Sequence, residues 1–124
     1  MSQTYSFVPD LNSEVQIPVD SILSSTLHED DSAKVVLFRF SQGQALSEHT
    51  ASKPATLQIL AGEARIQLGE DTVEAKPGSW IHMPPELPHA IEATTALTML
   101  IMQRPLPAIA AGILAAALVR LFTG

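Results

Sequence analysis

The chain has 124 residues, 46% of them apolar, which suits one domain with a hydrophobic core and is too short for two. Its formal net charge is −6, and its seven lysines and arginines are scattered rather than clustered, which argues against a nucleic-acid-binding surface. The chain has no cysteine, so disulfides, thiol catalysis and thiolate metal sites are excluded.

The N-terminal segment, residues 1–32, is predicted to be an extended arm. Aliphatic residues on both sides of Pro18, followed by Ser24-Ser25-Thr26, favour a strand or a short turn over a long helix. The first five residues have neither the basic start nor the apolar core of a secretory signal. We therefore expect a cytoplasmic protein.

Residues 33–103 contain a series of short strands separated by turn signals. Residues 64–68 alternate apolar and polar side chains, so Ala64, Ile66 and Leu68 are predicted to face inward and Arg65 and Gln67 to face water. Turn signals such as Lys76-Pro77-Gly78 separate the runs. The other predicted strands are residues 35–40, 56–60, 72–75, 79–83, a run beginning at His89, and 97–102. Short strands at regular intervals are typical of an all-β sandwich or barrel.

Two spacing patterns within this region resemble the motifs of the cupin family. The first motif, G-x5-H-x-H-x3,4-E-x6-G, is matched at Gly43, His49 and Gly62. The second motif, G-x5-P-x-G-x2-H-x3-N, is matched in spacing at Gly78, Pro84, His89 and Ala93. Residues 33–103 thus resemble a small, RmlC-like bacterial cupin. The resemblance implies an all-β double-stranded β-helix, or jelly-roll barrel, with His49 and His89 in one pocket.

Several motif positions depart from the family pattern. The second histidine of the first motif falls on Ala51 and its glutamate on Ala55. In the second motif the central glycine falls on Glu86 and the asparagine on Ala93. A cupin that binds a metal takes two histidines and the glutamate from the first motif and one histidine from the second. Only His49 and His89 remain from that set.

The resemblance implies a divalent transition metal, namely iron, manganese, nickel, copper or zinc, with His49 and His89 as candidate ligands. A catalytic zinc or iron site usually has at least three protein ligands, so a third must come from outside the motifs. His82 is a weak candidate. If Ile81 and Met83 form the inward face of their strand, alternation points His82 away from the pocket.

The C-terminal segment, residues 104–124, differs in character from the barrel. Prolines at 105 and 107 end the preceding strand, and residues 108–122 are alanine-rich and almost entirely apolar, which predicts a helix. Its fifteen residues would span only about 22 Å, against about 30 Å for a bilayer core, and Arg120 lies within it. We expect a helix that caps the barrel or exchanges in a dimer, with a peripheral membrane tail as the alternative.

Two classes of function remain open on these residues. One is a metal-dependent enzyme, dioxygenase- or isomerase-like, that acts on a small polar molecule. The other is a metal-free module that binds or senses a small molecule, with the two histidines as hydrogen-bonding groups or as a general acid and base. A structural assembly barrel is a third reading. The expected partners are a second copy of the chain, as a homodimer, and a small-molecule ligand, with no nucleic acid and no membrane.

Overall fold

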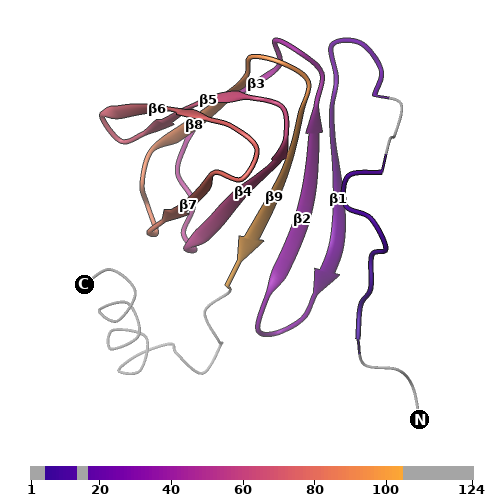
Figure 1. Ribbon diagram of the computed structural model, residues 1–124. Coiled ribbons are helices and arrows are strands. Elements are labelled where there is room, and N and C mark those ends of the chain that lie inside the picture. The colour runs from indigo at the N-terminus through magenta and orange to yellow at the C-terminus, as the bar shows by residue number, and fades with distance from the viewer. Residues whose placement is uncertain (1–4, 14–16, 105–124) are drawn as a thin grey trace, which may run out of the picture.

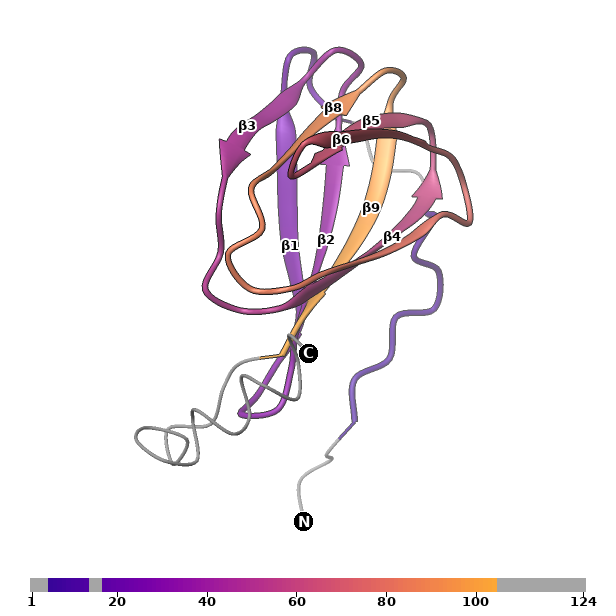
Figure 2. The ribbon, with the colours of Figure 1, turned by 90° about the vertical axis from the view of Figure 1, so that its left-hand side faces the viewer.

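The computed structural model describes residues 5–13 and 17–104, and these form nine strands in two antiparallel sheets (Figures 1 and 2). One sheet has the order β1-β2-β9-β4-β7 and the other β3-β8-β5-β6. The strands are β1 (Ile22–Glu29), β2 (Lys34–Phe40), β3 (Ala45–His49), β4 (Ala55–Ala61), β5 (Ala64–Leu68), β6 (Asp71–Ala75), β7 (Trp80–Met83), β8 (His89–Ala93) and β9 (Leu97–Gln103). The predicted jelly-roll barrel is confirmed.

The described part of the chain is entirely β-structure, turns and loops. It therefore contains no helix long and apolar enough to cross a lipid bilayer. The helix predicted for residues 108–122 lies outside the described residues.

Several strands, such as β4, β5 and β8, alternate buried and more exposed residues, because one face of each sheet is buried against the other sheet. In β5, Ala64 and Ile66 are buried while Arg65 between them is exposed, as predicted. Arg65 instead reaches across the outer surface to the Glu74 carboxylate on β6, at 2.9 Å. The same alternation on β8 buries His89 in a row with two apolar side chains.

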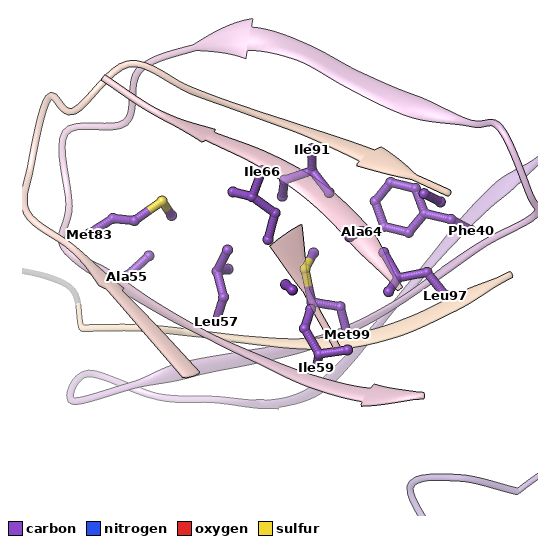
Figure 3. Close-up of a cluster of buried hydrophobic side chains, with 12 residues drawn as sticks. Phe40, Ala55, Leu57, Ile59, Ala64, Ile66, Met83, Ile91, Leu97 and Met99 are labelled. Carbon is purple, nitrogen blue, oxygen red and sulfur yellow. The ribbon is translucent and has the colours of Figure 1, made fainter. Parts of the chain in front are cut away.

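The hydrophobic core lies between the two sheets (Figure 3). Ile66 and Ile91 point from the four-stranded sheet toward Leu57 and Met99 of the five-stranded sheet. The buried cluster consists of Phe40, Ala55, Leu57, Ile59, Ala64, Ile66, Ala75, Met83, Ile91, Ala93, Leu97 and Met99. Removal of this apolar surface from water is the main stabilising contribution. Four of these residues, Ala55, Leu57, Met83 and Ile91, also line a cavity, so the core ends in an open space.

The strand at the N-terminal end of the barrel comes from the segment predicted as an arm. β1 pairs with β2 of the same chain, from Ile22 opposite Phe40 to Glu29 opposite Lys34. Before it, the Ser13 carbonyl accepts a hydrogen bond of 2.8 Å from Nη1 of Arg39 on β2. Residues 22–29 therefore belong to the five-stranded sheet, and their inner face contributes to the cavity.

Candidate functional site

A cavity of about 290 Å³ opens between the two sheets. This volume is at the small end of the range for small-molecule sites, about 300–1,000 Å³. Most of its wall is apolar, from side chains such as Phe38, Leu57 and Ile101. The polar side chains in the wall are Ser24, Thr26, Lys34, His49, Lys53, His89 and Gln103.

His49 and His89 form a direct cross-strand pair on β3 and β8. Their ring centroids are 4.2 Å apart and the ring planes are inclined by 59°. His89 is only 6% exposed, whereas His49 is exposed. The register between the two strands therefore brings the imidazoles side by side at the cavity. The His89 ring is buried in the wall, and the His49 ring lies nearer to solvent.

A bulge in β3 gives His49 its orientation. From Leu46 to His49 β3 advances three residues, while its partner β8 advances two, from Ile91 to His89. Residues three apart in a regular strand face opposite sides of the sheet, yet both Leu46 and His49 line the cavity. The extra residue of the bulge restores the common direction.

Both imidazoles are oriented by a backbone carbonyl two residues earlier in the chain. Nδ1 of His49 lies 2.8 Å from the Ser47 carbonyl oxygen, and Nδ1 of His89 lies 2.8 Å from that of Leu87. A carbonyl only accepts hydrogen bonds, so each Nδ1 carries the proton and donates it. In the neutral ring, each Nε2 is left with its lone pair for another partner.

His82 is not brought to the other two histidines. It lies on the outer face of β7, exposed, where its ring stacks on Trp80 with centroids 6.5 Å apart and planes inclined by 21°. Its Nδ1 is 3.3 Å from the Thr56 hydroxyl. The alternation of β7 directs Met83 into the cavity and His82 away from it, and neither His82 nor Trp80 lines the cavity.

Among the described residues, the side chains do not form a complete metal site. No group of three or more His, Asp or Glu side chains within residues 5–13 and 17–104 is arranged to hold one. The positions where the family motif has its other two ligands, Ala51 and Ala55, do line the cavity, but they offer only methyl groups. Two imidazole nitrogens fall short of the usual three or four protein ligands. The role of His49, His89 and His82 as metal ligands stays a prediction.

Five polar residues of the cavity were not predicted from the sequence to be pocket residues. Lys34 begins an alternating row with Val36 and Phe38, and this pattern would have placed it on the inner face. Ser24 and Thr26 alternate in the same way on β1. Lys53 comes from the loop between β3 and β4, and Gln103 from the last position of β9; no local pattern marks either as a pocket residue.

The loop between β7 and β8 has a non-glycine residue in the left-handed region. Glu86, at the position of the motif's central glycine, has φ of 67°. Its backbone N–H donates a 2.7 Å hydrogen bond to the Ala51 carbonyl, which joins two loops at the cavity. Left-handed backbone costs an ordinary L-residue about 1–2 kcal/mol. The hydrogen bond between the loops therefore holds Glu86 in a strained conformation.

Replacing Glu86 with glycine is expected to raise the free energy of unfolding by about 1 kcal/mol. The strain is removed, while the greater freedom of glycine in the unfolded chain offsets part of the gain. Urea denaturation followed by circular dichroism measures the change. Glu70→Gly is the control, because Glu70 is also an exposed turn residue but has no positive φ, and it should not stabilise the protein. Equal effects of the two substitutions would contradict the prediction.

Comparison with known proteins identifies the family. The family model described as Cupin domain matches residues 36–102, which is more than half of the chain. No curated protein matches the chain.

Solved structures support the same assignment. A conserved protein of unknown function from Streptococcus pyogenes is 32% identical, with 86% of this chain and 93% of that chain covered and a TM-score of 0.74. A cupin superfamily protein from Desulfitobacterium hafniense is 26% identical, with 73% and 83% covered and a TM-score of 0.69. A salicylate 1,2-dioxygenase from Pseudoaminobacter salicylatoxidans shares the fold alone, at 11% identity, with 69% and 27% covered and a TM-score of 0.64. The two-sheet barrel, the spacing of Gly43, His49, Gly78 and His89, and these matches together show that the chain belongs to the cupin family.

Proposed function

We propose that this cupin is a small-molecule-binding barrel whose pocket works without a resident metal ion. The observation that carries the proposal is the pair of imidazoles in the cavity wall. Both Nδ1 atoms are held by backbone carbonyls, and the positions of the missing ligands are alanines. Carbonyls that hold Nδ1 leave Nε2 free for a metal ion or for an organic ligand alike. The small number of donors, two where a metal site usually has three or four protein ligands, is what favours an organic ligand.

Binding would use the two kinds of surface in the cavity. The apolar wall contributes about 25 cal/mol for each Å² of apolar ligand surface removed from water. The Nε2 atoms of His49 and His89 accept hydrogen bonds from a ligand hydroxyl or N–H group, which fixes its orientation. A few placed polar groups in a mainly apolar cavity are typical of small-molecule sites.

The competing function is a metal-dependent enzyme of the dioxygenase or isomerase kind. One observation favours it: two Nε2 lone pairs in the same cavity wall are the start of a metal site. The fold neighbour named as a salicylate 1,2-dioxygenase supports no more than the shared fold. The metal content of the protein separates the two functions.

Elemental analysis of the protein, purified without a chelator or a metal-affinity tag, is expected to give well under one transition-metal ion per chain. The His49→Ala/His89→Ala double variant should give the same low value, because two imidazoles do not retain an ion through purification. His82→Ala serves as the matched control, since His82 lies outside the cavity. Stoichiometric iron, manganese, nickel, copper or zinc that is lost only in the double variant would overturn the metal-free proposal and establish the competing one.

A further inference from the structure

We propose that the ligand of this cavity is an organic acid, with one carboxylate group attached to an apolar body. This inference rests on the proposed function, because it requires that the cavity bind a small molecule. It is carried by two lysines in the cavity wall, Lys34 and Lys53.

The charge of the cavity is opposite to that of the protein. The chain has thirteen Asp and Glu residues against seven Lys and Arg, with a net charge of −6. Among the described residues, the wall of the cavity nevertheless contains Lys34, Lys53, His49 and His89 and no Asp or Glu. An acidic protein with randomly distributed charges would not be expected to have only basic residues among the charged residues of one cavity. The cavity is therefore suited to an anion.

The two lysines reach the cavity from different parts of the barrel. Lys34 begins β2 and pairs with Gln103, the last residue of β9. Its side chain belongs to the inward row that continues with Val36 and Phe38. Lys53 belongs to the loop between β3 and β4, close in the chain to Ala51 and Ala55 of the same wall. Their convergence on one cavity therefore results from the tertiary structure.

Neither lysine is neutralised within the part of the chain that the structure describes. Neither has a hydrogen bond or an ion pair through its side chain there, whereas Arg65 is paired with Glu74 and Glu92. Glu29 stands opposite Lys34 in the register of β1 and β2, but no ion pair joins them and Glu29 does not line the cavity. A bound carboxylate would accept charge-assisted hydrogen bonds from the ammonium groups, about twice as strong as bonds between neutral groups.

The rest of the wall defines the other part of the ligand. Phe38, Leu57 and Ile101 present apolar surface to the cavity. A small inorganic anion would leave this surface uncovered, while an acid with an aromatic or aliphatic body would bury it. The volume of about 290 Å³ limits the body to a small ring or a short chain.

Matched acids and amides test the inference by isothermal titration calorimetry. The pairs are phenylacetate with phenylacetamide and hexanoate with hexanamide, because each amide keeps the body and removes the charge. Acetate with acetamide tests the charge without a body. At least one of the two larger acids is expected to bind about tenfold or more tightly than its amide, as a charged hydrogen bond predicts. The affinity of the acid should fall as salt is added, since Lys53 is exposed.

The lysine variants locate the effect. Lys34→Gln/Lys53→Gln is expected to lose about tenfold or more in affinity for the acid, with the affinity for the amide unchanged. Lys76→Gln is the control, because Lys76 lies in the turn between β6 and β7 and does not line the cavity. Ala51→Phe should abolish binding of both members of a pair, since it fills the cavity from its wall. Melting curves of each variant show whether it remains folded.

The outcomes separate the two proposals. If acids and amides bind equally, or if the double lysine variant binds acids as well as the wild type does, the organic-acid inference is wrong while small-molecule binding stands. If each compound binds to Ala51→Phe as tightly as it binds to the wild type, binding occurs outside the cavity and both proposals fail. Both also fail if no member of any pair binds.

Discussion

Replacing Gly62 with alanine is expected to destabilise this cupin by at least about 3 kcal/mol. Gly62 has φ of 82°, in the left-handed region that ordinary L-residues avoid. A Cβ built on it would lie 1.8 Å from the Ala96 carbonyl oxygen and 2.9 Å from Cα of Leu97. Both are backbone atoms, so no side chain is able to move aside. The turn after β4 and the turn before β9 would have to separate.

Gly43→Ala is the matched control for this effect. Gly43 has nearly the same φ, 86°, but a Cβ there would meet no atom within 4 Å. It should therefore cost only the strain of the left-handed backbone, about 1–2 kcal/mol. Urea denaturation of both variants measures the difference. If Gly62→Ala does not fold at all, the loss of soluble, folded protein in comparison with Gly43→Ala reports its destabilisation. Similar stabilities of the two variants would show that close packing of the turns is not what requires Gly62.

Replacing Phe40 with alanine is expected to cost about 3–5 kcal/mol of stability. Phe40 is 0% exposed and lies in the core cluster at the end of β2 (Figure 3). Its removal loses the transfer free energy of the ring and leaves a hole between the sheets, which close packing does not easily refill. Thermal and urea denaturation measure the loss.

Phe38→Ala provides a comparison on the same face of the same strand. The ring centroids of Phe38 and Phe40 are 6.2 Å apart, but Phe38 is only partly buried and lines the cavity. Its removal enlarges an existing space, so we expect a smaller loss of stability than for Phe40→Ala and weaker binding of a ligand with an apolar body. If Phe38→Ala destabilises the protein as much as Phe40→Ala does, Phe38 belongs to the structural core and the cavity wall is misassigned.

Much of the fold follows from local patterns that the sequence displays. The alternation of Ala64, Arg65 and Ile66 predicts which side chains of β5 are buried, because a strand repeats every two residues whatever its neighbours are. The family resemblance placed His49 and His89 in one pocket, and in the structure both line the same cavity. In the same way, alternation on β7 separates His82 from Met83.

The other features of the site depend on how the strands pair. The bulge that turns both Leu46 and His49 inward exists only as a mismatch between β3 and β8. The predicted arm supplies Ser24 and Thr26 to the cavity because β1 pairs with β2 of its own chain. The bulge and the pairing of β1 with β2 each involve two strands, so the sequence pattern of a single strand does not predict them.

The sequence by itself determined the all-β class and the positions of most strands, and its resemblance to the cupin motifs gave the pair of histidines and the alanines, Ala51 and Ala55, at two of the usual ligand positions. Each of these depends on the identity and spacing of residues, which are local. Only the tertiary structure decided that Lys34 and Lys53 reach the same cavity. Lys34 begins β2, and Lys53 lies in the loop that leads into β4. Both β2 and β4 pair with β9, where Gln103 stands opposite Lys34 on one side and Ala55 on the other, so the meeting of the lysines depends on long-range strand pairing rather than on any sequence period.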